Sequence, residues 1–427
     1  MKTVVMVATA SPSANLNAAT FDSAWSIIAR SHWDSTYNGV DWKAVRDSLR
    51  PRALKARNQE ELRSVLTQML GTLRQSHFSI IPSEIGEGLG GQGRDQSGDI
   101  GATIRDVDGA ILVTAVRPGG AAERAGIRPG AAIQAVDGCV VAARQKVAGV
   151  QMDERRAKMT HWAAVTPLLS GPVGDTVRIL ARNGAGKLVV YAVKREAVGG
   201  MFTKVGNLPA MPARLETERR VVGGKNIGVI RFNVWMTVLS EGIRLAVDSL
   251  RGSDGIVLDL RGNVGGVVVM VNGVAGHFVD TALTLGTMIR KGGTTRYIIN
   301  PQRVNAQNKR VTPFAGPLAI VVDELSISTT EIFAGGLQSL NRARVFGAQT
   351  AGEAFPAVAE RLPNGDILYH AIASFLSPTG SPLEGVGVVP DVAVPITRSQ
   401  LLNGRDPALE AAVSWAASSG KGSVRPH

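Results

Sequence analysis

A serine at a strand-to-helix turn is the residue of this chain best placed to do chemistry. Residues 323–338 predict the end of a buried strand, a tight turn rich in Ser and Thr, and then the first turns of a helix. Such a turn lifts a serine out of the sheet and sets helix amides beside it, where they can hold an oxyanion. Ser328, followed three residues later by Glu331, is also an ordinary capping box, which satisfies amides at a helix start. The turn alone does not decide between a nucleophile and a cap.

Two other segments hold the polar groups that a reactive serine needs. Serine attacks a carbonyl carbon when a positioned base takes its proton and an acceptor orients that base. Residues 75–77 contain Ser76 and His77, and residues 350–353 end at Glu353. Together with the Ser/Thr turn, these segments predict a serine hydrolase whose reactive groups come from three distant parts of the chain.

Cysteine and histidine content limits the metal chemistry open to the chain. A single cysteine, Cys139, excludes an internal disulfide and any cysteine-based zinc site. None of the six histidines has a partner at metal-ligand spacing, so we expect no metal centre, and a serine hydrolase needs no cofactor. With 427 residues, 44% of them apolar, the chain is long enough for two or three domains with a sizeable core.

The net charge of +12 is scattered along the chain rather than gathered into a basic run. Without such a run or a base-stacking motif, it predicts a solvated basic surface and no nucleic-acid partner. No segment is long and uncharged enough to span a bilayer. Residues 1–14 combine one positive charge, a short apolar run and small residues. This pattern is typical of a minimal secretory signal and predicts a periplasmic or secreted protein, with a cytoplasmic one as the alternative.

The hydrophobic pattern divides the chain into three parts. Apolar residues recur at helical spacing over about residues 20–73, and residues 74–81 then predict a turn into a strand. After a Gly-rich link at 86–98, short alternating strands fill about residues 99–198. From about residue 199 the strands are continuously apolar, which predicts a sheet covered on both faces. These last strands are expected at 226–232, 255–260 and 317–323.

The middle part resembles a PDZ module of the bacterial protease type over nearly its whole length. The resemblance rests on residues 99–104, 111–116, 118–130, 133–138 and 169–179. A PDZ module binds an extended peptide by adding it as a strand to a sheet edge. By this resemblance, the amides of Ile100, Gly101 and Ala102 hold the terminal carboxylate of a substrate. The alternative is that Gly101 only permits a tight turn. A charged segment at 154–158 lengthens the connection before the second helix and has no assigned role.

Five motifs in a fixed order extend the resemblance to the whole chain. They are residues 259–266, 326–331, 342–347, 350–353 and 384–392. With the PDZ-like unit before them, the chain resembles the carboxy-terminal processing peptidases, the tail-specific and tricorn-like family of serine proteases, from about residue 20 to 415. The resemblance implies a multi-domain α/β protein with an inserted β-rich PDZ module and a crotonase-like protease core. The implied parts are a leader or signal at 1–16, a helical region at 17–92, a PDZ domain at 93–198, an α/β serine protease core at 199–415 and a disordered tail at 416–427.

The resemblance also implies which serine reacts. The family nucleophile lies three residues before the glutamate of a Ser-x-x-Glu element, and that residue is Ser328 here. Ser326 is expected to point the other way, whereas Thr329 and Thr330 are expected to enter the helix.

The base is expected to be a histidine. Many relatives use a Ser-Lys dyad, but this chain has Glu353 at the lysine position, and Lys421 is the only lysine that follows the nucleophile. A lysine base is therefore excluded. By resemblance to the tricorn-like branch, His77 is the base, while Ser76 and Glu353 support its imidazole, with Ser76 relaying a hydrogen bond to Glu353. His370 is the alternative base.

The oxyanion is expected to be held by two backbone amides. One is that of Thr329, directly after the nucleophile, and the other comes from the glycine turn at 263–266, with Gly265 as the expected donor. Close strand-helix packing is the alternative reason for these glycines. Asp259 and Arg261 are interpreted as structural residues.

The sequence therefore predicts a serine endopeptidase that forms an acyl-enzyme and acts on unfolded or tail-exposed proteins or peptides. The PDZ domain would engage the end of the substrate chain. The alternative is a catalytically inactive relative that binds peptides or apolar ligands, because fold does not dictate function. A trypsin-like protease is excluded, since the position of its nucleophile in Gly-Asn-Ser-Gly-Gly is occupied by Val264. The sequence does not indicate an oligomeric state.

Overall fold

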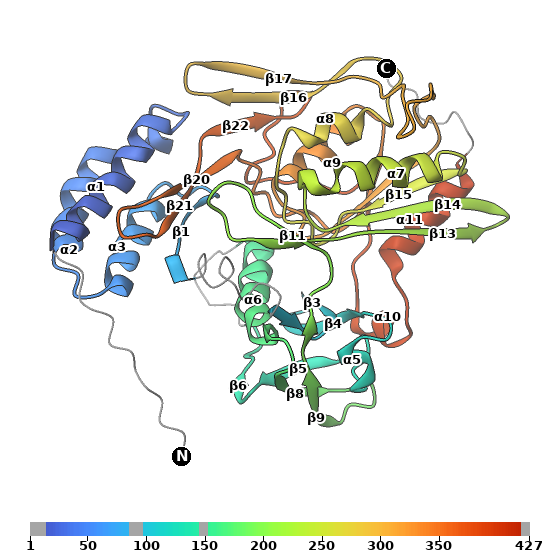
Figure 1. Cartoon of the computed structure of the whole chain (residues 1–427), viewed down its shortest axis with the longest axis horizontal. Helices are drawn as coiled ribbons and strands as arrows, with labels where there is room; N and C mark the ends of the chain where they lie inside the picture. Colours follow the sequence, from blue (N-terminus) through green and yellow to red (C-terminus); the bar gives the residue numbers. More distant parts are fainter. Residues whose placement is uncertain (1–13, 85–96, 145–152, 420–427) are drawn as a thin grey trace.

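The computed structural model describes residues 14–84, 97–144 and 153–419. Three parts are visible in Figure 1: a helical bundle at the left, a large α/β core, and a β-rich unit below the core. Residues 1–13 of the expected leader, 86–96 of the Gly-rich link and 420–427 of the expected tail lie outside the described residues. The prediction of a disordered tail from residue 416 is wrong for residues 416–418, which end a helix that packs on the core.

The N-terminal part is built from three helices, as the helical spacing predicts. They are α1 (Ala14–Ser31), α2 (Trp42–Leu54) and α3 (Gln59–Gly71), with the 3-10 turn η1 (Tyr37–Gly39) between the first two. The side chains of Asp41 and Asn58 cap α2 and α3 by accepting backbone N–H bonds. The buried faces of all three helices share one hydrophobic cluster, which also takes in Leu362 and Leu368 of the C-terminal part.

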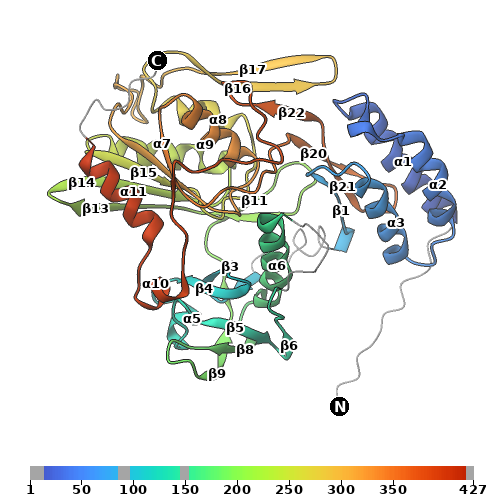
Figure 2. The same cartoon turned by 180° about the vertical axis from the view of Figure 1, so that it is seen from behind.

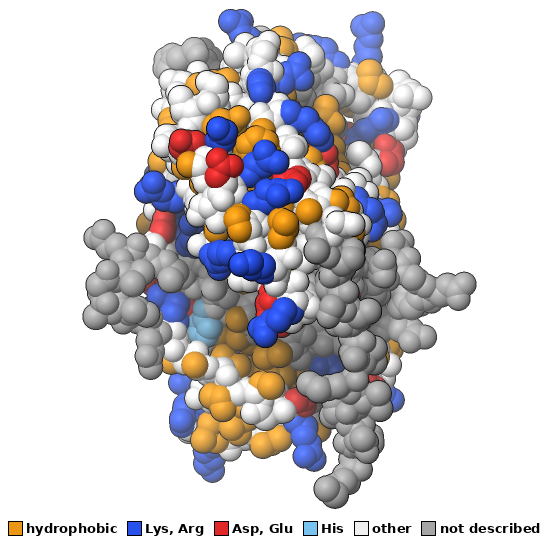
Figure 3. All heavy atoms as spheres, turned by 90° about the vertical axis from the view of Figure 1, so that its left-hand side faces the viewer, with side chains coloured by type: hydrophobic (Ala, Val, Ile, Leu, Met, Phe, Trp, Pro, Cys, Tyr) orange, Lys and Arg blue, Asp and Glu red, His pale blue; other side chains and the backbone are white. Residues whose placement is uncertain are grey.

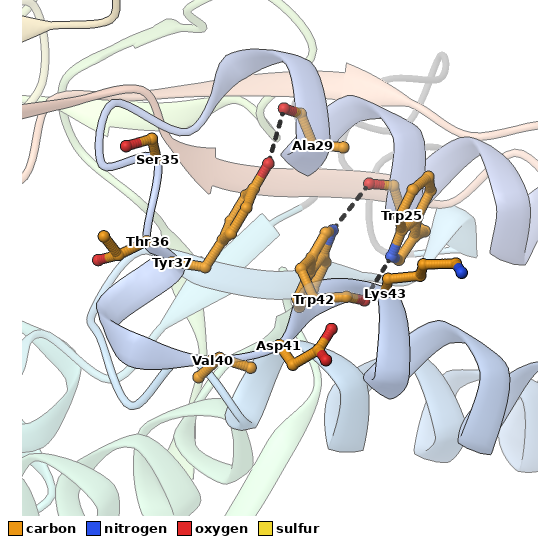
Figure 4. A pocket seen from close by; sticks show the side chains of 9 residues that line it. All are labelled: Trp25, Ala29, Ser35, Thr36, Tyr37, Val40, Asp41, Trp42 and Lys43. Atoms are coloured by element: carbon orange, nitrogen blue, oxygen red, sulfur yellow. Dashed lines mark hydrogen bonds between the residues drawn. The ribbon is translucent and has the colours of Figure 1, made fainter.

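Two tryptophans fix the crossing of α1 and α2 (Figure 4). The indole N–H of Trp25 donates to the carbonyl of Trp42 at 2.8 Å, and that of Trp42 donates to the carbonyl of Trp25 at 3.2 Å. A surface pocket opens beside them and is lined in part by Tyr37. None of the predicted catalytic residues lines this pocket.

The β-rich unit contains a six-stranded sheet, in which five strands form one path and a sixth, short strand pairs beside it. Its path is β3 (Ala102–Val107), β4 (Ala110–Val116), β5 (Ala132–Val136), β8 (Thr176–Arg182) and β9 (Leu188–Lys194), and β6 (Cys139–Val140) pairs with β5. Two helices pack on this sheet, α5 (Ala121–Arg124) and α6 (Glu154–Leu169). A separate three-stranded sheet has the order β10 (Glu196–Ala197), β2 (Ser97–Asp99) and β7 (Gly171–Pro172). Strand β3 is at the edge of the sheet and contacts α6, so the unit has the strand-and-helix edge that peptide addition needs.

The charged segment 154–158 is part of that helix. These residues are predicted to lie in a connection before the second helix, but they form the first turns of α6, with Asp153 as N-cap. The error has a physical cause. Only Val165 and Leu169 of α6 are buried, so the helix has little apolar periodicity to reveal where it begins.

The core is organised on a six-stranded sheet that is parallel except at one edge. Its order is β13 (Leu215–Val222), β14 (Lys225–Phe232), β15 (Gly255–Asp259), β18 (Leu318–Val322), β19 (Arg344–Gly347) and β23 (Val392–Ala393), with only β13 antiparallel to its neighbour. The three strands expected from continuous apolar runs are β14, β15 and β18, so those predictions are confirmed.

Helices cover both faces of this sheet, which explains why its strands are apolar throughout. One face packs on η3 (Thr237–Leu239), α7 (Ser240–Leu250), α8 (Met270–Ala275) and α9 (Thr329–Ser339), and the other on α11 (Pro407–Ser418). Along β18, the side chains of Leu318, Ile320 and Val322 enter the first cluster, while those of Ala319 and Val321 enter the second.

Smaller sheets connect the core to the other parts. Strands β1 (Phe78–Ile81), β21 (Ile367–Ala371) and β20 (Ala357–Arg361) form one sheet, so the segment after His77 pairs directly with the C-terminal part. Strands β17 (Gly293–Ile299), β16 (Leu283–Arg290) and β22 (Ala373–Leu376) form another, and β11 (Met201–Thr203) pairs with β12 (Met211–Ala213).

The β-rich unit is fastened to the core from two sides. Figures 1 and 2 show α6 between the β-rich unit and the core, and the short helix α10 (Arg398–Leu402) beside the β-rich unit. From α6, the Arg155 guanidinium donates to the carbonyls of Thr350, Gly385 and Val386. From α10, Arg398 donates to the carbonyls of residues 130, 182 and 183, and Leu401 packs in a cluster with β-rich residues.

The charge on the surface is dispersed, as expected from the sequence. On the face shown in Figure 3, Lys and Arg side chains alternate with acidic, apolar and polar ones rather than forming a single block. Elsewhere in the chain, basic residues are paired with acids, as Arg46 and Arg50 are with Asp22. None of the helices in the described ranges combines the length and the apolar character that a bilayer crossing requires.

Candidate active site

Ser328 lies at the sharp turn between β18 and α9. Its backbone has φ 58° and ψ −117°, a conformation that non-glycine residues rarely adopt. The Asp323 carboxylate shapes the turn by accepting the N–H bonds of Gly262 and Leu325, at 2.8 and 3.1 Å. Strain of this kind concentrates at functional sites, where the surrounding structure enforces it. Ser328 is also the N-cap of α9 and forms a capping box with Glu331, so both roles expected for this residue coexist.

The neighbouring hydroxyl groups are committed to structural bonds. Ser326 is fully buried, and its Oγ donates to the carbonyl of Leu260 at 2.9 Å. Thr329 Oγ1 donates to the carbonyl of Gly266 at 2.9 Å, and Thr330 Oγ1 donates to Asn263. Ser328 is only partly buried and is therefore the accessible hydroxyl of the turn.

Glu331 joins the serine turn to the loop that contains residues 350–353. Its fully buried carboxylate accepts the backbone N–H bonds of Ser328, Gly352 and Glu353, and the hydroxyl of Thr350, at 2.6–3.0 Å. Burial raises the pKa of Glu331 to about 7, while these donated hydrogen bonds act to lower it. The bonds hold the two segments in a fixed relation.

His77 and Ser76 form a hydrogen-bonded chain with Glu384. Ser76 Oγ lies 2.7 Å from Nδ1 of His77 and donates to Oε2 of Glu384 at 2.9 Å. The N–H of Ser76 also approaches Oε1 of Glu384, at 3.2 Å. The sequence analysis expected Ser76 to relay to Glu353, but the carboxylate that Ser76 contacts is that of Glu384. Glu384 opens the motif 384–392, which was used only as a sign of the family resemblance.

Glu353 contacts the nucleophile turn through its backbone. Its carbonyl accepts the N–H of Ser328 at 2.9 Å, so its backbone is directly beside the nucleophile turn. Among the described residues, we find no hydrogen bond to its carboxylate. Burial and, to a smaller extent, the charge of Glu353 raise the pKa of both Tyr369 and Glu384. The next residue, Ala354, donates its N–H to Oε2 of Glu384 at 2.9 Å.

One network therefore connects the three predicted catalytic segments. It runs from Ser328 to the backbone of Glu353, through Ala354 to Glu384, and from there to Ser76 and His77. No hydrogen bond joins His77 to Ser328 within the described residues, and catalytic hydrogen bonds often tighten only when substrate binds.

The surroundings of His77 keep its ring neutral. Burial lowers the pKa of His77 to about 4, because the charged form loses hydration. The ring packs against that of Tyr369, with the centroids 5.5 Å apart and a tilt of 42°. Burial, followed by the charge of Glu353, raises the pKa of Tyr369 to about 12, so this phenol is neutral at physiological pH.

The predicted oxyanion amides lie next to Ser328. A Cβ added at Gly265, where φ is 88°, would lie 2.8 Å from the Ser328 Cβ, so only glycine fits there. The Gly265 N–H, however, already donates to Oδ1 of Asn263 at 3.1 Å. Within the described residues, no acceptor is found for the N–H groups of Thr329 and Gly266.

The predicted peptide-binding loop is partly occupied by side chains of the chain itself. Ile100 and Gly101 connect β2 to β3, and Ala102 is the first residue of β3. The Gly101 N–H donates to the carboxylate of Asp99 at 2.9 Å, and the Arg117 guanidinium lies against Gly101. A bound carboxylate would therefore have to displace Asp99 from the Gly101 amide.

The remaining candidates have structural surroundings. His370 is fully buried, with Nδ1 3.3 Å from Ser31 Oγ and Nε2 3.1 Å from Glu360 Oε1, so both ring nitrogens have partners away from the serine turn. Asp259 is bonded to Arg231 and Arg261, which hold its pKa well below the usual range against the effect of burial. In the part of the chain that the structure describes, no group of three or more Cys, His, Asp and Glu residues is placed to hold a metal ion.

Comparison with known families identifies the three parts of the chain. Residues 226–394 match peptidase family S41, residues 17–71 match the tricorn protease C1 domain, and residues 79–162 match the PDZ domain. Three regions of the chain are thus similar to the models of peptidase family S41, the tricorn protease C1 domain and the PDZ domain. This domain set agrees with the predicted class, a serine peptidase among the hydrolases.

Two curated proteins illustrate the similarity in sequence. A probable CtpA-like serine protease of Staphylococcus epidermidis (strain ATCC 12228 / FDA PCI 1200) is 25% identical over 258 residues, which cover 60% of this chain and 49% of that protein. A probable CtpA-like serine protease of Staphylococcus aureus (strain N315) is 31% identical over 179 residues, which cover 42% of this chain and 35% of that protein. The chain thus spans about half the length of these relatives or less.

Solved structures confirm the fold. The photosystem II D1 C-terminal processing protease superposes with a TM-score of 0.61 at 22% identity, over 94% of this chain and 97% of that one. Mature CPAF complexed with lactacystin gives 0.61 at 13% identity, over 95% and 98%. The tricorn protease gives 0.51 at 16% identity, over 94% of this chain and 36% of that one. The predicted multi-domain α/β architecture with helical, PDZ and core parts is confirmed.

Proposed function

We propose that the protein is a serine endopeptidase that cleaves unfolded or tail-exposed proteins or peptides through an acyl-enzyme on Ser328. The observation that carries the proposal is the hydrogen-bonded chain from His77 through Ser76 to Glu384, linked to a strained and accessible serine. In this proposal His77 is the base, and Ser76 and Glu384 are the partners that orient it.

The hydrogen bonds assign the tautomer of His77. Because Ser76 Oγ gives its proton to Glu384, it must accept one from His77, so Nδ1 carries the proton. This leaves Nε2 unprotonated and able to accept the proton of Ser328. Glu384 would stabilise the imidazolium formed during attack, acting through the Ser76 hydroxyl.

The reaction follows from this arrangement. Ser328 Oγ attacks the scissile carbonyl carbon while its proton moves to Nε2 of His77, and the tetrahedral intermediate collapses as His77 protonates the leaving amine. Water then enters, loses a proton to His77 and hydrolyses the ester on Ser328, which restores the free enzyme.

The developing negative charge needs amide donors that are not already engaged. Thr329 N–H remains the first donor, as expected from the sequence. For the second, we favour the Gly266 N–H over that of Gly265, because the Gly265 amide is bonded to Asn263. Loss of one such donor costs about 3 kcal/mol of transition-state stabilisation.

The PDZ domain is proposed to bind the end of the substrate chain at the edge of β3. The edge position of β3 and its contact with α6 support this role. Arg117 would attract the terminal carboxylate to the loop at Ile100–Ala102, where Asp99 now occupies the Gly101 amide. A periplasmic or secreted location is proposed from the sequence pattern of residues 1–14.

The test is cleavage of denatured casein by the wild type, Ser328→Ala and Ser79→Ala, with circular dichroism to verify folding. Ser79 is an exposed serine of β1 and serves as the matched control. Cleavage by the wild type and Ser79→Ala but not by Ser328→Ala is the expected result. Cleavage by all three would contradict Ser328 as the nucleophile, and no cleavage by any would favour the alternative of an inactive peptide-binding relative.

A further inference from the structure

Glu353 is an acidic residue in the active site that the proposed mechanism leaves unused. Its backbone bonds to Ser328, but within the described residues its half-buried carboxylate has no hydrogen-bond donor. Glu384, by contrast, accepts bonds from Ser76 and Ala354. A partly buried carboxylate without a protein donor has lost part of its hydration without gaining a partner, which is unfavourable.

The charges around the site are unbalanced. Glu353 and Glu384 are both acidic, and burial keeps His77 neutral. The cation that acts on Glu353 is Arg156, an exposed residue of α6. Burial nevertheless raises the pKa of Glu353 above its usual value, with Arg156 opposing it, so this arginine compensates the desolvation only in part.

The position of Glu353 relative to the base indicates which part of a substrate it meets. His77 has to protonate the leaving amine, so the residue after the scissile bond must pass on the side of the His77 ring. That ring packs on Tyr369, and Tyr369 feels the charge of Glu353. Glu353 is adjacent to the nucleophile, because its carbonyl accepts the Ser328 N–H at 2.9 Å, and we assign its carboxylate to the leaving-group side.

We propose that Glu353 is a specificity residue that selects substrates with a Lys or Arg side chain immediately after the scissile bond. This inference rests on the proposed peptidase function. The cationic side chain supplies the missing hydrogen-bond donors to the carboxylate, and a charge-assisted bond of this kind corresponds to about a tenfold to hundredfold gain in kcat/KM. The same carboxylate disfavours an acidic side chain at that position.

The experiment uses two sets of fluorogenic peptides on the full-length chain. In the first set, the residue after the scissile bond is Lys, norleucine or Glu; in the second, the same three are placed before the bond. Wild type, Glu353→Gln and Glu353→Lys are compared, with Glu216→Gln, an exposed acid of β13, as the matched control. Circular dichroism verifies folding, and mass spectrometry verifies the bond that is cut.

The expected result is a preference for Lys over norleucine of about tenfold or more in the first set, in both wild type and Glu216→Gln. The preference should fall to near unity in Glu353→Gln and shift toward Glu in Glu353→Lys, while the second set shows no comparable change. If the peptides are cleaved without a preference for Lys, or if Glu353→Gln keeps that preference, the inference is overturned. The peptidase function would then still stand. A folded wild type that cleaves none of the peptides and no casein would overturn both.

Discussion

The nucleophile turn and the base segment of this active site are built in different ways. The turn at residues 323–331 is local: a buried strand ends, Ser326 and Asp323 bond within the turn, and Glu331 caps the helix that follows. The base segment at residues 75–77 is held by distant partners, because Ser76 bonds to a carboxylate 308 positions away. A local turn leaves a pattern in the sequence, whereas a long-range contact does not.

The largest expected effect tests the base segment. His77→Ala removes the group that accepts the proton of Ser328, so kcat should fall by about 100- to 10,000-fold, the usual contribution of general acid-base catalysis. The assay is steady-state hydrolysis of a neutral peptide, with His370→Gln as the comparison because that ring is committed to Ser31 and Glu360. A larger loss of kcat in folded His370→Gln than in His77→Ala would instead favour His370 as the base.

A second change tests the local turn. In Glu331→Gln, an amide N–H₂ group replaces one oxygen of the buried carboxylate and faces groups that are themselves hydrogen-bond donors. The unfolding free energy should therefore fall by about 1–3 kcal/mol, and kcat should fall as well. Urea unfolding monitored by tryptophan fluorescence measures the change. Glu216→Gln, on the surface, is the control and should alter stability by at most about 0.5 kcal/mol.

The link between α6 and the active-site loops gives a smaller prediction. Arg155→Ala removes the donors to the carbonyls of Thr350, Gly385 and Val386, which flank Glu353 and Glu384. Hydrogen exchange in residues 350–353 and 384–387 should become faster, with a several-fold lower kcat/KM. Arg178→Ala, an exposed arginine of the same domain, should leave exchange there as in the wild type; equal acceleration in both would show that the contact does not order the loops.

The smallest expected effect is a shift on the pH axis. His77 must be neutral to act as a base, and burial lowers its pKa from 6.5 to about 4. The ring of His77 should therefore stay neutral as pH falls through 6.5 and gain a proton only nearer to 4. Titration of the His77 imidazole followed by NMR measures this separately from the titration of Glu331, and a midpoint at or above 6.5 would contradict the buried environment of His77.

The same contrast explains what could be predicted from the sequence. Continuous apolar runs gave β14, β15 and β18, since strands buried on both faces have no polar side to mark. Ser328 is predicted as the nucleophile from the family resemblance, whose Ser-x-x-Glu element can be recognised because the serine and its capping glutamate are close in sequence.

The sequence predicts Glu353 as the acid that Ser76 contacts, whereas the structure has Glu384 in that position. Glu353 follows the nucleophile by a short stretch and replaces the lysine of related enzymes, so it was the natural choice. The loop that contains Glu384 reaches Ser76 only because the whole chain has folded. Backbone amides raise a similar problem, since the bond from Gly265 to Asn263 cannot be inferred from a run of glycines.

The central claim, that Glu384 and not Glu353 supports the base, is tested most directly by comparing kcat for Glu384→Gln and Glu353→Gln on one neutral peptide. Glu384→Gln weakens the acceptor that orients Ser76 and His77, so its kcat should fall by about 100-fold or more, while that of Glu353→Gln falls by less than tenfold. The reverse order, in two variants that remain folded, would contradict the account and return Glu353 to the relay.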